Sequence, residues 1–286
     1  MTTDRIKIIE CPRDAMQGWD NLISTENKIR YIRQLMKIGF DTIDFGSFVS
    51  HEAIPQMADT EEVANNLVNE VSQTKLLAII ANYRGAQDAA RHVNITYLGY
   101  PFSVSPTFQM RNANSTIEES YERVKEIQQL CVHENKTLVV YLSMAFGNPY
   151  GDKYSEAIVI KTAEAIAKMG VHIISLADTV GLATPGQVED LCKAVIPEFP
   201  DHEIGLHLHS TGENRKAKLD AALNQGCRRF DGAILGYGGC PMSGNALVGN
   251  MDTGWMVRYF NKEGYMDGIN MEALGMAEET ASQIFI

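Results

Sequence analysis

Two histidines separated by a single residue are the side chains in this sequence best suited to binding a cation. They form His207-Leu208-His209 at the end of a short apolar run. If that run is a strand, both rings project to the same side of it, because side chains along a strand alternate with a period of two. One metal ion could then bind both imidazoles. The motif is short, however, and a ring that only donates to a neighbouring carbonyl fits it equally well.

Asp14 and Asn250 add oxygen donors to this pair. Asp14 follows the first apolar run of the chain, and Asn250 follows the last in Val248-Gly249-Asn250. If the chain closes a parallel barrel, the first strand lies beside the eighth and the eighth beside the seventh, so all four side chains converge. Two imidazoles, a carboxylate and an amide oxygen suit Mg, Mn, Co or Zn and leave positions for a chelating substrate.

Arg13 is the cation nearest to this expected metal site in the sequence. Its guanidinium could stabilise negative charge on an enolate or carbonyl oxygen, or it could form a salt bridge with a strand-end carboxylate such as Asp44. Asp44 and Asp178 end two further apolar runs, where each could assist proton transfer or orient a ligand. For Asp178, a side chain that closes the turn Ala177-Asp178-Thr179-Val180-Gly181 is the structural alternative.

Cys240 follows two glycines in Tyr237-Gly238-Gly239-Cys240-Pro241, after the eighth apolar run. Paired glycines allow a positive φ and could place the thiol at the C-terminal opening of the expected barrel, where it would donate or take a proton. Most cysteines are instead small buried residues, which is what the helical patterns around Cys131 and Cys192 predict.

The elements that would position these residues are eight strand-like runs, most of them followed by a helical pattern. This alternation predicts an α/β fold with a (β/α)8 TIM barrel, since no nucleotide-binding glycine motif favours an open sheet. No linker divides the chain, so residues 1–286 are predicted to form one domain with a C-terminal helical tail over Met271–Ile286. The expected strands are Ile6–Cys11, Thr42–Phe45, Leu76–Ala81, Ile95–Leu98, Leu138–Ser143, Ile173–Leu176, Ile204–Leu208 and Phe230–Ile234.

Four local signals give the expected helix limits. Ser24 and Thr25 should begin one helix and Gly39 should close it, while a short third helix should span Gly85–His92. In Ser115-Thr116-Ile117-Glu118 we expect a capping box in which Glu118 reaches back, and Thr184-Pro185 should begin another helix.

Composition limits the partners. The 286 residues carry a formal charge of −11 at pH 7, which argues against nucleic-acid binding. The five cysteines are scattered and odd in number, which indicates a reducing compartment rather than a disulfide framework. No run approaches the roughly 20 apolar residues of a membrane span. With no signal-peptide pattern at the N-terminus, these features predict a cytoplasmic protein that does not bind membranes.

Six motifs in order along the chain resemble those of hydroxymethylglutaryl-CoA lyases, from about Ile6 to Thr253. Metal-dependent barrel lyases and condensing enzymes in general share the Arg-Asp and His-x-His elements, whereas Ser-Phe-Val-Ser and Gly-Gly-Cys-Pro indicate the lyases. The motifs are Pro12-Arg13-Asp14-x-x-Gln17, Ser47-Phe48-Val49-Ser50, Pro55-Gln56-Met57-x-Asp59, Asp178-Thr179-x-Gly181, His207-x-His209-x-Thr211 and Gly238-Gly239-Cys240-Pro241.

The resemblance implies metal-dependent cleavage of 3-hydroxy-3-methylglutaryl-CoA, or a close 3-hydroxyacyl-CoA, to acetyl-CoA and acetoacetate by a homo-oligomer such as a dimer. Mg or Mn is the implied metal, with Zn or Co as alternatives. Arg13 would stabilise the enolate, Cys240 would protonate it, and His207 and Asp44 would also act in catalysis. The implied metal ligands are Asp14, His207, His209 and Asn250, and the implied substrate contacts are Gln17, Asn82, Ser143 and Asp178.

Three departures from the family pattern bear on the substrate. Asp44 stands where the family has a glutamate, and Ser210 stands where it has an aspartate. The segment from Cys240 to Asn250 is one residue longer than expected, which leaves Asn245 as a rival ligand. Isopropylmalate or citramalate synthases, pyruvate-forming aldolases and a non-enzymatic acyl-CoA-binding barrel are the alternatives.

Overall fold

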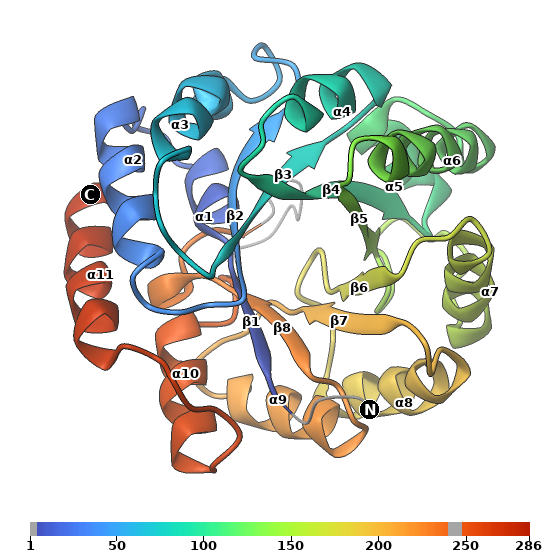
Figure 1. Cartoon of the computed structure of the whole chain (residues 1–286). Helices are drawn as coiled ribbons and strands as arrows, with labels where there is room; N and C mark the ends of the chain where they lie inside the picture. The colour runs from blue at the N-terminus through green and yellow to red at the C-terminus, as the bar shows by residue number, and fades with distance from the viewer. Residues whose placement is uncertain (1–4, 240–247) are drawn as a thin grey trace.

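Eight parallel strands close into a barrel in the computed structural model, which describes residues 5–239 and 248–286 (Figure 1). Each strand pairs with the next along the chain, and β8 returns to β1 with Phe230 opposite Ile8. All eight predicted runs form strands, which confirms the (β/α)8 barrel. The strands are β1 (Lys7–Glu10), β2 (Thr42–Phe48), β3 (Lys75–Ile80), β4 (Ile95–Ser103), β5 (Thr137–Ser143), β6 (Ile173–Ala177), β7 (Glu203–His207) and β8 (Arg229–Gly232).

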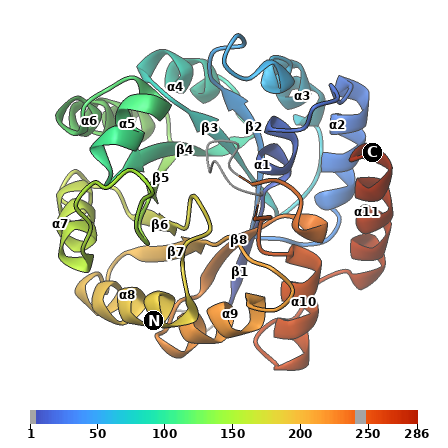
Figure 2. The same ribbon diagram turned by 180° about the vertical axis from the view of Figure 1, so that it is seen from behind.

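Helices surround this barrel on the outside, as the view from behind also shows (Figure 2). The predicted C-terminal tail is confirmed as α11, which lies beside α2. No helix in the described ranges is long and apolar enough to span a bilayer. The helices are α1 (Pro12–Gln17), α2 (Thr25–Leu35), α3 (Thr60–Leu67), α4 (Tyr83–Ala90), α5 (Pro106–Ala113), α6 (Ile117–His133), α7 (Glu156–Ala167), α8 (Pro185–Val195), α9 (Arg215–Asn224), α10 (Thr253–Lys262) and α11 (Met271–Ile284), with 3-10 turns at Pro55–Met57, Ile196–Glu198 and Ile234–Gly236.

The helix starts follow the predicted capping chemistry, with two corrections. The capping box of α6 uses Glu119 rather than Glu118, because Thr116 is the N-cap and the residue three positions later reaches back to its N–H. Helix α4 begins at Tyr83 rather than Gly85, because the Asn82 side chain accepts from the Gly85 N–H and caps the first turn.

The inside of the barrel combines an apolar cluster with a buried charged group. Leu77, Tyr97, Val139, Tyr141 and Ile173 form the apolar cluster. Arg229 on β8 fills the remaining space toward β7, where a Cβ at Gly205 would lie 2.8 Å from its Cδ. The glycine therefore makes room for the buried side chain of Arg229, whose Nη1 donates to Glu203 at the start of β7.

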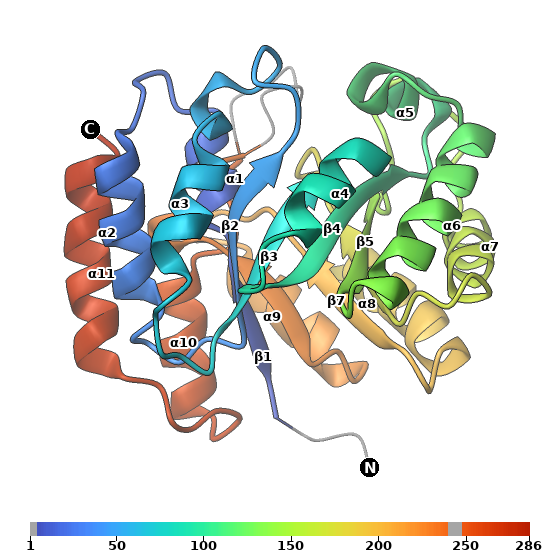
Figure 3. The same cartoon turned by 45° about the horizontal axis from the view of Figure 1, so that its top comes forward.

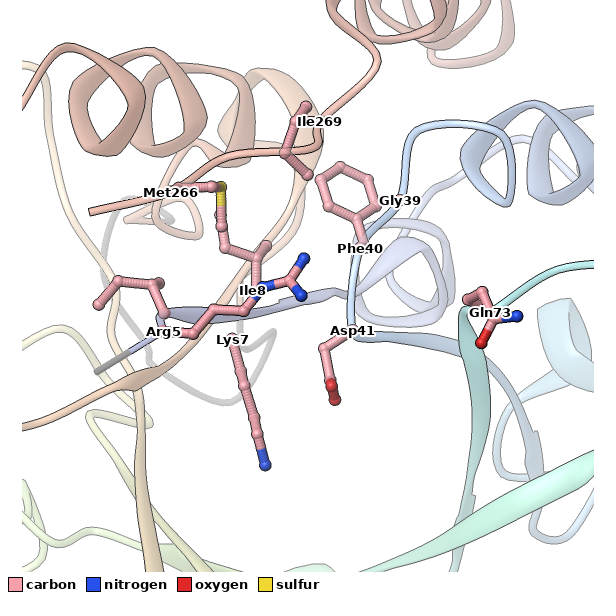
Figure 4. A pocket seen from close by; sticks show the side chains of 10 residues that line it. Arg5, Lys7, Ile8, Gly39, Phe40, Asp41, Gln73, Met266 and Ile269 are labelled. Atoms are coloured by element: carbon pink, nitrogen blue, oxygen red, sulfur yellow. The ribbon is translucent and has the colours of Figure 1, made fainter. Parts of the chain in front are cut away.

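A small cavity of about 180 Å³ lies at the opposite, N-terminal end (Figure 4). Arg5, Asp41 and Gln73 lie around it, at or just before the starts of β1, β2 and β3. Active sites of such barrels lie at the C-terminal ends of the strands, so we assign this cavity to the structural end of the fold.

Candidate active site

A cavity of about 500 Å³ opens at the C-terminal ends of the strands. Its lining includes Arg13 and Asp14 from α1, Tyr141 from β5, His207 from β7 and His209 just beyond it. Each of these side chains lies near the C-terminal end of a strand or just beyond it, so the barrel closure brings together residues that are nearly 200 positions apart in the sequence.

The two histidine rings lie on the same side of the chain, as the His-x-His spacing predicted, with centroids 5.5 Å apart. The Nδ1 atom of His209 lies 2.8 Å from the Val248 carbonyl oxygen, and that of His207 lies 3.3 Å from Asp231 Oδ2. Both partners can only accept, so Nδ1 carries the proton in each ring. In the neutral form of each ring, Nε2 then keeps its lone pair for a metal ion.

Asp14 and Asn250 meet beside these rings. The Asn250 amide group donates from Nδ2 to Asp14 Oδ2 at 2.7 Å and to the Tyr237 carbonyl at 2.9 Å. Its amide oxygen is buried, and no described residue donates to it. Gly238 permits this approach, because a Cβ there would lie 2.7 Å from Asn250 Nδ2.

The charges at this end of the barrel favour a cation. Burial alone would raise the pKa of Asp14, but Arg13 and His207 lower it to about 2, which keeps the carboxylate ionised. Burial would likewise lower the pKa of His207, but the hydrogen bond to Asp231 and the charge of Asp14 raise it. Burial lowers the pKa of His209, which keeps that ring neutral and available as a ligand.

These residues fit a divalent cation. They make a mixed nitrogen and oxygen set of the ionised Asp14, the Asn250 oxygen and the Nε2 atoms of the two imidazoles. No described residue donates a hydrogen bond to these two nitrogens or to the Asn250 oxygen. Cys11, His207 and Asp231 also offer ligand atoms within 4.8 Å of one another. We favour the first set, because burial raises the pKa of the Cys11 thiol and Asp231 already holds His207 Nδ1.

Arg13 connects this group to Asp44. Its Nε and Nη2 atoms donate to Asp44 Oδ2 at 3.0 and 2.6 Å, and Nη1 donates to Asp14 and Gln17 at 3.1 and 2.9 Å. Burial raises the pKa of Asp44 to about 6, although Arg13 opposes that shift. The predicted salt bridge is therefore present, and it leaves Arg13 at the cavity wall.

Comparison with known proteins adds independent evidence. Residues 5–280 match the family model described as HMGL-like. The chain belongs to the HMGL-like family. It is 34% identical to the mitochondrial hydroxymethylglutaryl-CoA lyase of Mus musculus over 94% of this chain and 82% of that protein. It is 36% identical to the hydroxymethylglutaryl-CoA lyase YngG of Bacillus subtilis over 83% of this chain and 80% of that protein.

A solved structure of this HMGL-like type has a closely similar fold. It is an HMG-CoA lyase from Acinetobacter baumannii in complex with coenzyme A and 3-methylmalate, which superposes with a TM-score of 0.92. The two chains are 32% identical, and the match covers all of this chain and 92% of that one.

Three of the four residues expected to contact substrate line the cavity of this HMGL-like chain, namely Gln17, Asn82 and Ser143. Asp178 is not part of the lining. Its carboxylate accepts from Lys218 Nζ at 3.1 Å and from the Ala183 N–H at 3.0 Å, and it is fully buried. This position supports the turn role that the sequence left open, and a substrate contact by Asp178 stays a prediction.

Two positions named from the sequence, Cys240 and Asn245, lie outside the described residues. The positive φ expected of the paired glycines before Cys240 is confirmed, at +92° for Gly238 and +137° for Gly239. Ser210, where the family pattern has an aspartate, donates from its hydroxyl to the Met251 sulfur and takes no part in the cation-binding group.

The sequence reasoning missed Asp231, the hydrogen-bond partner of His207. It lies on β8 in a run that was predicted as a strand, and a search for carboxylates near strand ends would have found it. It also passed over Tyr141, whose hydroxyl has no partner among the described residues and whose ring packs edge-on against His207.

Proposed function

We propose that this protein is a divalent-metal-dependent carbon–carbon lyase that cleaves 3-hydroxy-3-methylglutaryl-CoA, or a close 3-hydroxyacyl-CoA, to acetyl-CoA and acetoacetate. The observation that carries the proposal is the Asn250 amide oxygen, which has no donor among the described residues and lies beside Asp14 and the two histidines. Arg13 donates to this Asp14 carboxylate. Membership of the HMGL-like family and relatives named as hydroxymethylglutaryl-CoA lyases support the reaction class.

The cation would be held by Asp14, His207, His209 and Asn250. Mg or Mn is preferred over Zn or Co because two of the four donor atoms are oxygens. When bound, the cation would supply charge stabilisation for substrate oxygens. Asp231 and the Val248 carbonyl keep the two imidazoles in the tautomer that a ligand needs.

The reaction breaks the bond between C2 and C3 of the acyl group. The tertiary hydroxyl loses its proton as C3 becomes the ketone of acetoacetate, and the electron pair remains on C2 as the enolate of acetyl-CoA. Arg13 has five N–H donors, of which its four hydrogen bonds use four, so one N–H of Nη2 is left to stabilise the enolate oxygen.

Two further groups would move protons. Asp44 keeps Oδ1 without a partner among the described residues, so this oxygen can take the proton of the tertiary hydroxyl directly or through a water. Cys240 would protonate C2, a role that rests on the sequence resemblance and on its place after Gly238 and Gly239.

The test is an assay of the purified protein with Mg and a panel of 3-hydroxyacyl-CoA thioesters, in which acetyl-CoA release is measured. Release from 3-hydroxy-3-methylglutaryl-CoA that stops on treatment with EDTA and returns with Mg or Mn supports the proposal. Consumption of acetyl-CoA with a 2-oxo acid, and no thioester cleavage, would instead place the protein among the condensing enzymes.

The proposal extends to the setting of the enzyme. We expect residues 1–286 to form one domain. We expect the enzyme to be a dimer and to work in a reducing compartment such as the cytoplasm. Four buried cysteines in the described part, Cys11, Cys131, Cys192 and Cys227, are free thiols, which agrees with a reducing compartment. Gel filtration with light scattering measures the oligomeric state.

A further inference from the structure

Cys11, His207 and Asp231 lie together next to the active-site cavity, and the lyase chemistry leaves the Cys11 thiol unused. Figure 3 shows β1 rising from the N-terminus into the barrel with α1 above it, and Cys11 lies between these two elements. The Cys11 N–H donates to the Gly232 carbonyl of β8 at 2.8 Å, and Asp231 of β8 pairs with His207 of β7. The three strands therefore bring a sulfur, an imidazole nitrogen and a carboxylate oxygen within 4.8 Å of one another.

The Asp231 carboxylate and the Cys11 thiol are both buried and only partly used. Asp231 is 2% exposed, and its Oδ1 has no partner among the described residues. A buried carboxylate oxygen without a donor destabilises the fold. Cys11 is 1% exposed, and its Sγ lies 3.6 Å from the Ile9 carbonyl, which is a weak contact for a thiol. Both groups are therefore available to a ligand that brings positive charge.

The spacing of the three groups suits a tetrahedral cation. Ligand atoms bound to zinc at about 2.0 to 2.3 Å lie roughly 3.3 to 3.8 Å from one another in a tetrahedral site. The distance of 3.3 Å between His207 Nδ1 and Asp231 Oδ2 already matches one edge of such a site. Because all three ligand atoms lie within 4.8 Å of one another, shifts of roughly 1 Å complete the set.

The charges around Cys11 also favour a cation. Burial raises the pKa of the Cys11 thiol, the nearby carboxylates of Asp231, Asp44 and Asp14 raise it further, and Arg13 opposes them. Without a metal the thiol therefore stays protonated. A divalent cation reverses this balance, because it replaces the thiol proton and is attracted by the same carboxylates.

We propose that Cys11, His207 and Asp231 form a second cation site, which binds a thiophilic divalent metal such as Zn or Cd and then excludes the cation of the proposed lyase. Zn prefers thiolate and imidazole ligands, whereas Mg and Mn prefer oxygen, so the two sites differ in selectivity. Binding of the second cation depends on these three residues alone. The exclusion rests on the proposed function, in which His207 is also a ligand of the first cation.

The exclusion follows from the two nitrogens of the His207 ring. Nδ1 faces Asp231, so the second cation binds this nitrogen. The thiol proton of Cys11 then passes to solvent, and the ring proton moves from Nδ1 to Nε2. Nε2 no longer has the lone pair that Mg or Mn requires, so a filled second site prevents binding at the first.

The experiment uses the full chain after its metal has been removed with EDTA. Calorimetry measures the affinity for Zn, and the affinity for Mn with and without Zn. Co is the spectroscopic probe, because a thiolate ligand gives it a sulfur-to-metal charge-transfer band that nitrogen and oxygen ligands do not give.

The variants separate the two sites and the rival thiols. Cys11→Ala and Cys11→Ser remove the proposed sulfur ligand. Cys131→Ala is the matched control, because Cys131 is a buried free thiol on α6. Cys240→Ser removes the thiol that is the proposed proton donor, and His209→Asn removes a ligand of the first site only.

We expect Co to show the sulfur band in the parent, in Cys131→Ala, in Cys240→Ser and in His209→Asn. Both Cys11 variants should lose the band and bind Zn roughly 100-fold more weakly, since even the loss of a contact to a metal ligand costs up to about that factor. Their Mn affinity and Mg-dependent turnover should stay close to those of the parent. Zn should displace Mn from the parent at lower concentration than from the Cys11 variants.

A sulfur band that persists in both Cys11 variants, or that disappears in Cys240→Ser, would overturn the second site. A band that disappears in His209→Asn would overturn it as well, because Co would then occupy the first site. If Zn leaves the Mn affinity of the parent unchanged, the exclusion is wrong. If the band depends on Cys11 but the parent cleaves no thioester, the second site is supported and only the lyase proposal fails.

Discussion

Arg13 donates two hydrogen bonds to one and the same oxygen of Asp44, Oδ2, and leaves Asp44 Oδ1 without a described partner. A salt bridge and a catalytic role therefore do not exclude each other for this arginine. The bridge fixes the plane of the guanidinium, and the remaining N–H of Nη2 is then available at the cavity wall. The shorter aspartate, in place of the glutamate of the family pattern, still reaches Arg13.

The first prediction concerns Arg13→Lys. We expect turnover to fall by about 10²-fold or more, because a point charge on a flexible stem cannot bridge Asp44 and also stabilise an enolate. Steady-state kinetics and metal analysis of the same preparation check this. Near-normal kcat would show that Arg13 only connects Asp14 and Asp44.

The second prediction concerns Asp231→Asn. The amide can donate to His207 Nδ1 and so place the proton on Nε2, which removes the lone pair that a cation requires. We expect Mn affinity to fall by roughly 10- to 100-fold, measured by calorimetry. Asp220→Asn is the control, because Asp220 is a carboxylate on α9 that contacts Lys216 and Tyr259 rather than the site. Equal metal affinity in the Asp231 variant and the parent would contradict the predicted tautomer.

The third prediction concerns Glu10, a fully buried carboxyl on β1. Burial raises its pKa from 4.5 to about 8, and its Oε2 has no partner among the described residues. Between these two pH values the folded state holds the proton more tightly than the unfolded state, so the free energy of unfolding falls as pH rises. Glu10→Gln cannot ionise and should lose this part of the pH dependence.

The free energy of unfolding of Glu10→Gln, relative to that of the parent, should rise by on the order of a few kcal/mol from pH 4.5 to 8. Urea unfolding at a series of pH values measures it. The exposed Glu263→Gln provides the control. A difference that stays constant with pH would mean that Glu10 is already ionised in the folded protein.

The fourth prediction concerns Cys240. Cys11, Cys131, Cys192 and Cys227 are all buried, so iodoacetamide should label Cys240 first in the native protein, and bound substrate should protect it. Cys240→Ser should lower kcat by roughly 10² to 10⁴ and keep metal binding, because a hydroxyl is a far weaker acid than a thiol. Turnover at the parent rate would remove the feature that separates the lyases from the condensing enzymes.

The sequence by itself determined the barrel and the main members of the site. Eight β-rich runs separated by helical patterns leave few other folds, and a period of two places both rings of His207 and His209 on one side of their strand. The convergence of Asp14, Asn250 and the histidines follows from barrel closure, because chain order fixes which strands become neighbours.

Only the tertiary structure decided how each polar atom is used. Whether Asp178 meets a substrate or a lysine depends on Lys218, which α9 brings to it from 40 residues away. The local sequence pattern shows the periods of strands and helices. A hydrogen bond between side chains that are distant in the sequence depends on interatomic distances, which only the packed fold sets.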